Sequence, residues 1–132
     1  MKSNHYAPDD PREWLNGARS NLAKARSRVS PDVYLEDLCF DAQQAAEKAL
    51  KGVLIKRGVG FPYVHDLGCL LTLAKESGLE LPESILDVAR LTDYAVESRY
   101  PGVSEAVTTE EYESALRLAE EVVAWAARVV EE

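Results

Sequence analysis

The 132-residue sequence lacks long apolar runs and has few residues of the kinds that build metal or redox sites. No segment offers the roughly 20 consecutive apolar residues that a membrane span needs, and the N-terminal stretch MKSNHYAPDDPREW has no apolar region like that of a signal peptide. These absences predict a cytoplasmic protein. Cys39 and Cys69 each lie within an apolar helical pattern, which favours core roles over metal or redox roles. The histidines, His5 and His65, are too few and too separated for a metal site, so we expect no metal and no cofactor.

A basic surplus is also absent. The net charge of −8 argues against broad, nonspecific binding of nucleic acid, which needs a basic surface. The charge is uneven, because residues 11–60 carry nine Lys/Arg and six Asp/Glu whereas residues 61–132 carry five and fifteen. The first of these halves is able to meet an acidic partner. Uneven solvated helix faces explain the same pattern equally well.

No stretch alternates polar and apolar residues as a half-buried strand does, so the sequence predicts an all-α protein. We expect residues 1–9 to form a flexible tail and residues 10–132 to form a single up-and-down helical bundle. Capping residues (Asp10, Asp66 and Thr108), prolines and glycines mark about five helices. They are expected at about 11–28, at about 31–57, in a short stretch from 67, from 82 to before Pro101, and from 109 to the C-terminus.

The spacing of apolar residues predicts which side of the last two helices faces the core. In the expected fourth helix this side carries Ile85, Ala89, Thr92 and Val96, and the expected fifth helix has a similar apolar side. The core positions of that fifth helix are Tyr112, Leu116, Ala119, Val123, Ala126 and Val130.

The second helix carries two organised faces. One is apolar and rich in alanine, which lets the first or the fifth helix pack closely against it. The other is a narrow polar stripe that contains one aromatic residue, and Glu47 and Lys51 within it have the order of a favourable i, i+4 ion pair. Long amides beside an aromatic ring suit a contact surface that tolerates water, so we expect this stripe to form a homodimer interface. The expected interface residues are Phe40, Gln43, Gln44, Glu47 and Lys51. A solvated face with one exposed aromatic remains the alternative.

Three motifs in order, CFDAQQAAEKALKGVL, FPYVHDLGCLL and RYPG, are followed by a Thr-capped C-terminal helix. Over about residues 10–130 this combination resembles the prokaryotic branch of the HEPN family, the higher eukaryote and prokaryote nucleotide-binding domains. The resemblance implies a helical bundle, usually a homodimer, that is frequently encoded beside a small nucleotidyltransferase and works with it as a toxin-antitoxin pair. By position it also implies a polar group made of His65, Asp66, Arg99 and Tyr100.

Many HEPN proteins are metal-independent ribonucleases with an Arg followed four to six residues later by His, and this chain departs from that pattern. After Arg99 the matching positions are Ser104, Glu105 and Ala106, so the motif supplies no general acid or base. Arg57 and His65 are one residue too far apart to match. We therefore expect a protein that is not catalytic, or only weakly so.

The expected function is that of a dimeric partner of a small nucleotidyltransferase, with nucleotide or RNA as the candidate ligand. The candidate binding residues are Lys51, His65, Arg99 and Tyr100, and binding is expected to be weak and salt-sensitive. For Arg99 the alternative is a structural role, pairing with helix carbonyls or with Asp66. The competing functions for the whole chain are a ribonuclease toxin with a non-standard active site and a purely structural assembly module.

Overall fold

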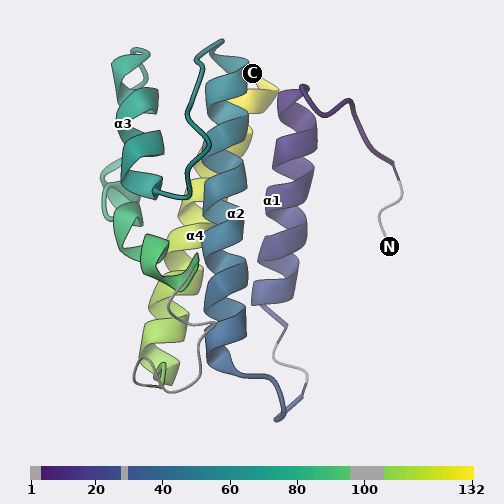
Figure 1. Ribbon diagram of the computed structural model, residues 1–132, viewed down its shortest axis with the longest axis vertical. Helices are drawn as coiled ribbons and strands as arrows, with labels where there is room; N and C mark the ends of the chain where they lie inside the picture. Colours follow the sequence, from purple (N-terminus) through teal and green to yellow (C-terminus); the bar gives the residue numbers. More distant parts are fainter. Residues whose placement is uncertain (1–3, 28–29, 96–105) are drawn as a thin grey trace.

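A computed structural model describes residues 4–27, 30–95 and 106–132 of the chain. These residues form a helical bundle without strands, which confirms the all-α prediction (Figure 1). The elements in chain order are α1 (Pro11–Ala25), α2 (Leu35–Lys56), α3 (Leu67–Glu76), the 3₁₀ segments η1 (Glu83–Ile85) and η2 (Val88–Ala95), and α4 (Thr109–Glu131).

Three helices begin at the capping residues that the sequence predicts. The Asp10 carboxylate accepts a hydrogen bond from the backbone N–H of Arg12, Asp66 accepts from Cys69, and the Thr108 hydroxyl accepts from Glu111. Each bond satisfies one of the amide groups that a helix N-terminus leaves without an intrahelical partner. At the other end of α2, Gly58 has a φ of 71°, a left-handed conformation that suits glycine and stops the helix.

Two predicted helix boundaries are wrong by about one helical turn. The first helix ends at Ala25, with Arg26 as its C-cap, rather than near Arg28, which lies outside the described residues. The second begins at Leu35 rather than Pro31. Pro31 instead occupies the second position of a turn closed by a hydrogen bond from the Val33 N–H to the Ser30 carbonyl, 3.2 Å long. Ser-Pro is a signal for such a turn as well as for a helix start.

The predicted fourth helix is not α-helical in the described part. Residues 83–85 and 88–95 form 3₁₀ turns, in which three residues make one turn and positions i and i+3 fall on the same side. Ile85, Val88 and Leu91 are accordingly buried, whereas Ala89, predicted to face the core, is exposed. The predicted stop at Pro101 lies outside the described residues.

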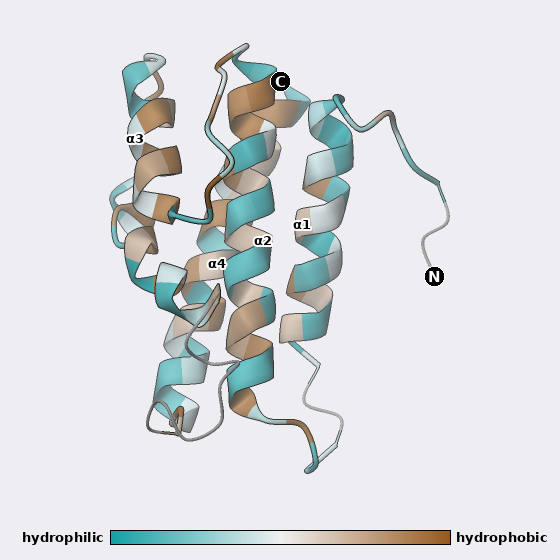
Figure 2. Ribbon diagram, viewed as in Figure 1, coloured by the Kyte–Doolittle hydropathy of each residue, from teal (hydrophilic) through white to brown (hydrophobic). Residues whose placement is uncertain are grey.

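The alanine-rich face of α2 forms the centre of the core, as predicted. In Figure 1, α2 lies between α1 and α3 and in front of α4. Its alanines are at most 1% exposed, and a Cβ added at Gly52 would lie 3.2 Å from the Trp14 Cβ and 3.3 Å from the Pro11 carbonyl oxygen. The small residues therefore let α1 come close to α2. Apolar residues follow the sides of the helices that face one another (Figure 2). The predicted core of α4 is buried too, except that Leu116 is only half-buried.

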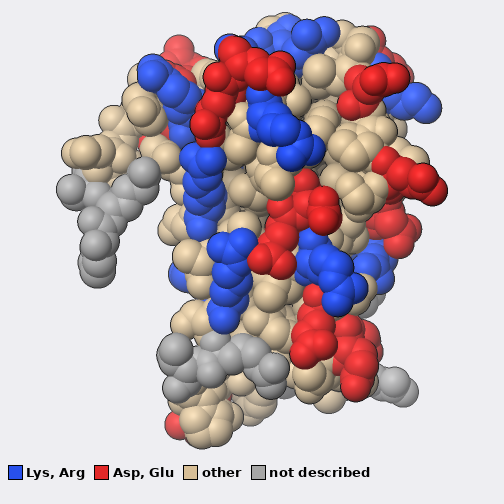
Figure 3. Space-filling model, turned by 180° about the vertical axis from the view of Figure 1, so that it is seen from behind, with Lys and Arg blue, Asp and Glu red and all other residues tan. Residues whose placement is uncertain are grey.

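The surface on the far side of the bundle carries interspersed acidic and basic side chains (Figure 3). Two ion pairs of 2.8 Å, Arg19 with Glu131 and Arg26 with Glu120, join α1 to α4. Among the described residues no helix is long and apolar enough to span a membrane.

The two cysteines differ in burial, and the N-terminal segment packs on α1. Cys39 is fully buried, as expected, and burial raises the pKa of its thiol to about 12. Cys69 is only half-buried on α3. Residues 4–10 contact α1, since the His5 ring nitrogen Nδ1 lies 2.8 Å from Glu13 Oε2 and the Trp14 indole donates to the Pro8 carbonyl.

Candidate functional site

The polar stripe of α2 is mostly buried within the chain. Gln43 is 0% exposed, Glu47 4% and Lys51 6%, whereas Phe40 and Gln44 are half-buried. Buried charged groups are uncommon unless they are paired. Much of the stripe that the sequence predicts to be a contact surface is therefore a buried polar network within the chain.

Glu47 is the centre of that structure. Its Oε1 accepts hydrogen bonds from Gln43 Nε2 at 2.9 Å and from His65 Nδ1 at 2.8 Å, and its Oε2 pairs with Lys51 Nζ at 3.0 Å. Gln44 Nε2 extends the network by donating to Gln43 Oε1 at 2.8 Å. Burial would raise the pKa of Glu47, but the hydrogen bonds from Gln43, His65 and Lys51 and the charge of Lys51 outweigh it and hold the pKa below its ordinary value. The carboxylate is therefore ionised at neutral pH.

Lys51 is enclosed by aromatic rings as well as paired with Glu47. Its ammonium lies 6.0 Å from the ring centroid of Trp14, 5.7 Å from that of Phe61 and 5.8 Å from that of Tyr63. Ring faces at this distance attract a cation. The charge of Lys51 is therefore satisfied inside the chain, and its side chain is only 7% exposed.

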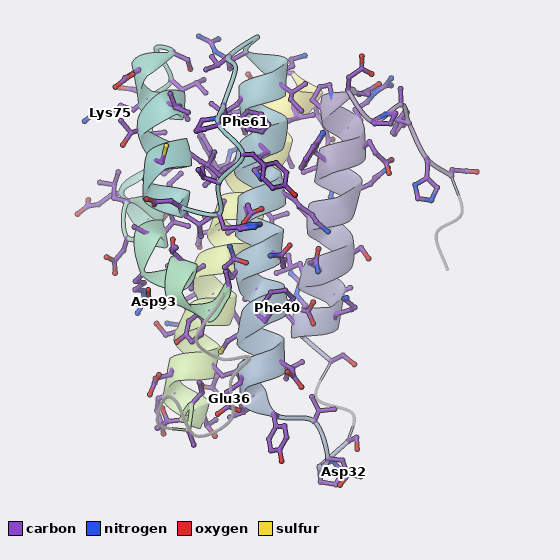
Figure 4. All side chains as sticks on the ribbon, viewed as in Figure 1. Asp32, Glu36, Phe40, Phe61, Lys75 and Asp93 are labelled. Carbon is purple, nitrogen blue, oxygen red and sulfur yellow. The ribbon has the colours of Figure 1, made fainter. Side chains whose placement is uncertain are left out.

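The loop between α2 and α3 covers this network. The Val59 N–H donates to the Leu54 carbonyl at 2.9 Å just after the left-handed Gly58, which turns the chain back along α2. Phe61 then packs edge-on against Trp14, with ring centroids 6.4 Å apart. Figure 4 shows Phe61 on this loop beside the upper half of α2 and Phe40 on the lower half.

His65 stands at the boundary between this network and solvent. Its side chain is 55% exposed although Nδ1 is bonded to the buried Glu47. Tyr63, two residues earlier, is 96% exposed, and its ring meets the imidazole edge-on with centroids 6.3 Å apart. The following Asp66 has a structural role as the cap of α3. Next to it, the Leu67 N–H donates to the Thr92 hydroxyl at 3.1 Å, which ties the loop to η2.

A second polar network joins α1 to α2. Lys48 Nζ donates to Asn21 Oδ1 at 2.7 Å, Asn21 Nδ2 donates to Asp41 Oδ1 at 3.0 Å, and Lys24 Nζ pairs with the same carboxylate at 3.3 Å. Burial, together with the nearby charge of Lys24, lowers the pKa of Lys48. No local pattern in the sequence predicts this network, because its members are ordinary surface residue types spread over two helices.

The structure brings together some of the predicted site residues and leaves others untested. Lys51 and His65 meet on Glu47, whereas Arg99 and Tyr100 lie outside the described residues. Arg57, which comes close to matching the Arg of the ribonuclease motif, donates to the Ser77 carbonyl at 2.6 Å.

The dimer interface stays a prediction. Of its residues, only Phe40 and Gln44 keep a partly exposed side chain, since Gln43, Glu47 and Lys51 are covered by the chain itself.

Tyr63 and Trp14 complete the surroundings of the network and were not singled out from the sequence. The stretch FPYVHD did place an aromatic residue two positions before His65, which was the available signal for Tyr63. The contact of Trp14 with the loop depends on how α1 packs, so no local pattern could reveal it. Within the ranges that the structure describes, no group of three or more His, Cys, Asp or Glu side chains could hold a metal ion.

The arrangement offers one accessible imidazole, oriented by a buried carboxylate, beside one exposed aromatic ring. A carboxylate that accepts from one ring nitrogen of a histidine holds the ring and leaves the other nitrogen to meet a ligand. Chemically, this combination suits hydrogen bonding and stacking, and it is able to move a proton.

The comparisons with known proteins agree with this architecture. The family model described as "HEPN domain" matches residues 11–130. The chain belongs to the HEPN domain family. The solved structure of TT1696 from Thermus thermophilus is 34% identical, with a TM-score of 0.74 over 90% of this chain and 97% of that one.

A second solved structure matches almost the whole chain as well. ST0689, an archaeal HEPN homologue, is 27% identical, with a TM-score of 0.72 over 92% of this chain and 98% of that one. No curated protein matches the chain. Fold and family are thus established over almost the whole sequence.

Proposed function

We propose that this HEPN protein is the dimeric partner of a small nucleotidyltransferase in a toxin-antitoxin module, and that it binds nucleotide or RNA beside His65. The observation that carries the binding proposal is the convergence of Lys51 and His65 on the Glu47 carboxylate, next to the exposed ring of Tyr63. Two residues named from the sequence as ligand contacts thus meet at one carboxylate, and of the two only His65 reaches the surface.

The ligand-binding part of the proposal rests on exposure and chemistry. Tyr63 presents a ring to solvent, and bases of single-stranded nucleic acid stack on such rings. His65 adds a polar group 6.3 Å away, centroid to centroid. The net charge of −8 disfavours tight binding driven by phosphates alone, so affinity is expected to be weak.

The binding test uses a short fluorescent RNA and fluorescence anisotropy. Wild type is expected to bind, and His65→Ala and Tyr63→Leu are expected to bind more weakly. Tyr34→Leu is the matched control, because Tyr34 is 73% exposed but lies at the start of α2, away from this loop. Equal affinity in all four proteins would refute the proposed binding site.

Association is the second part of the proposal. Phe40 and Gln44 remain partly exposed on α2 and offer an apolar ring beside an amide, which suits a symmetric contact. Light scattering is expected to give a dimer mass for wild type and a lower average mass for Phe40→Glu and Gln44→Arg. Arg19→Ala, which removes an exposed pair between α1 and α4, should leave the mass unchanged. A monomer at high protein concentration would contradict the dimer.

The nucleotidyltransferase partner is supported by family membership and by the motif order of the prokaryotic branch. Affinity purification from the native cell, followed by mass spectrometry, tests it. A small nucleotidyltransferase should be recovered with wild type, and expression of either protein alone should reveal which one is toxic. If neither protein is toxic and no nucleotidyltransferase is recovered, the chain is better described as an assembly module.

A ribonuclease with a non-standard active site is the second candidate function. One specific observation favours it. Glu47 holds His65 by Nδ1, as the buried acid of a catalytic dyad holds its histidine, so the imidazole could act as a general base. We expect purified protein not to cleave RNA, because Lys51, the lysine joined to Glu47, is buried and paired and so is not free to stabilise the developing phosphate charge. Cleavage that is lost in His65→Ala, with folding intact, would show that the enzyme reading is right.

A further inference from the structure

The charge balance around Glu47 bears on which part of a nucleotide this surface could recognise. Among the described residues, Lys51 is the one lysine or arginine whose ammonium or guanidinium is joined directly to Glu47, and it is 6% exposed. An ammonium already paired and surrounded by three rings has little attraction left for a phosphate in solution. Lys48, the next lysine along α2, donates to Asn21 in the other network. Neither Lys51 nor Lys48 is therefore free to bind a phosphate beside His65.

The hydrogen bond to Glu47 also decides what His65 offers. An ionised carboxylate only accepts hydrogen bonds, so the imidazole nitrogen Nδ1, 2.8 Å from Oε1, must carry a proton. In the neutral imidazole the other nitrogen, Nε2, is then an acceptor with an available lone pair. Within the described residues Nε2 has no hydrogen-bond partner, and the side chain is 55% exposed. Neutral His65 therefore presents an acceptor to solvent, which matches a ligand group that donates.

Tyr63 supplies the surface on which such a ligand would lie. Its ring is almost fully exposed and makes an angle of 64° with the imidazole. A flat base stacked on Tyr63 would meet the imidazole at the same steep angle, so its polar edge rather than its face would approach His65. Stacking depends little on base identity and not on charge.

We propose that this surface recognises an unpaired nucleobase rather than a phosphate: the base stacks on Tyr63 and an exocyclic amino group donates to Nε2 of His65. The inference rests on the proposed nucleotide or RNA binding and states which part of that ligand is read. It reverses the expectation of salt-sensitive contact through Lys51, because the buried ion pair removes that charge from the surface.

Nucleosides test the inference, since they carry a base but no phosphate. Isothermal titration calorimetry with adenosine is expected to show binding that changes little between low and high salt. Purine riboside, which lacks the amino group, should bind roughly three- to tenfold more weakly, as expected for one lost hydrogen bond. Ribose 5-phosphate should not compete.

Variants locate the contact. Tyr63→Leu should weaken adenosine binding roughly fivefold or more, and His65→Ala should abolish the preference for adenosine over purine riboside. Tyr34→Leu should bind like wild type. Because Tyr63 is exposed, its replacement leaves the fold intact even if His65→Ala loosens the loop.

The outcomes separate this inference from the broader proposal. If RNA or a nucleotide binds but adenosine does not, or if ribose 5-phosphate competes, recognition is by phosphate and the inference is overturned while nucleotide binding stands. Equal affinity for adenosine and purine riboside would also overturn it. If neither RNA, nucleotide nor nucleoside binds, both proposals fail.

Discussion

Replacement of Glu47 by glutamine should cost this protein a large part of its stability. The substitution keeps the shape of the side chain but removes the charge that Lys51 pairs with, 3.0 Å away. In the wild type the two carboxylate oxygens accept from three side chains, since Gln43 and His65 bond to Oε1 while Lys51 pairs with Oε2. Glutamine has only one oxygen that can accept from these donors. An amide nitrogen in the second position cannot accept a hydrogen bond.

The expected magnitude follows from burial. Removing one partner of a buried ion pair costs about 3–5 kcal/mol, because a charge is left unpaired in a poorly solvated place. Here the remaining amide oxygen still accepts one bond, and the three aromatic rings around Lys51 still attract its charge. We therefore expect a loss of about 2–4 kcal/mol. In urea denaturation at fixed protein concentration this lowers the midpoint by about 1–2 M, given an m-value of about 2 kcal/mol per M.

A control and a second variant make the test specific. Glu131→Gln breaks an exposed pair with Arg19, in which the Arg19 and Glu131 side chains are 51% and 54% exposed, and should cost less than about 1 kcal/mol. Adding Lys51→Met to Glu47→Gln removes the unpaired ammonium and should recover more than half of the loss. If Glu47→Gln were as stable as Glu131→Gln, the buried network would not stabilise the fold and the reasoning would be refuted.

Four further outcomes are expected in denaturation experiments. Because the pKa of Glu47 is lowered in the folded protein, the ionised carboxylate stabilises the fold fully above its ordinary pKa of 4.5, and this stabilisation is lost as the pH falls through the folded pKa. The difference in unfolding free energy between wild type and Glu47→Gln should therefore become smaller in acid. Gly52→Ala should cost about 1–3 kcal/mol, because its Cβ would lie 3.2 Å from the Trp14 Cβ. Gly17→Ala should cost less than Gly52→Ala, because its Cβ would lie 3.1 Å from the Lys48 Cδ, an atom of a lysine stem that shifts more easily than backbone, and alanine favours the helix by up to about 1 kcal/mol. Tyr112→Phe should cost about 1–2 kcal/mol, because the buried hydroxyl donates at 2.6 Å to the last carbonyl of α1.

Local patterns in the sequence were sufficient for the helices whose ends carry strong caps. Asp10, Asp66 and Thr108 each act within three residues of their own position, so the chemistry of the cap is visible in the sequence. Ser30-Pro31 was wrongly predicted to start a helix, because the same two residues favour a turn as well as a helix start. Local patterns failed elsewhere too. They could not separate a 3₁₀ segment from an α-helix over 83–95, because apolar residues at i, i+3 suit both.

The candidate site was predictable only in part. Glu47 and Lys51 are four residues apart on one helix, so their pairing follows from helix geometry alone. The contact of His65 with Glu47 spans 18 residues and needs the loop to turn back along α2, which the left-handed Gly58 begins and the packing of Phe61 on Trp14 from α1 supports.

What the sequence by itself determined is therefore the class of fold, the family, most helix boundaries and the two faces of α2. Periodicity and capping are properties of neighbouring residues, and they survive whatever the helices pack against. Tertiary structure alone decided that the polar face of α2 is largely buried, that the Lys51 ammonium is paired with Glu47 inside the chain, and that His65 is held on Glu47 by Nδ1 while its side chain stays 55% exposed. Burial and charge pairing depend on which distant segment covers a side chain, and here the 57–66 loop covers that face because the hydrogen bond from His65 to Glu47 and the packing of Phe61 on Trp14 hold it there.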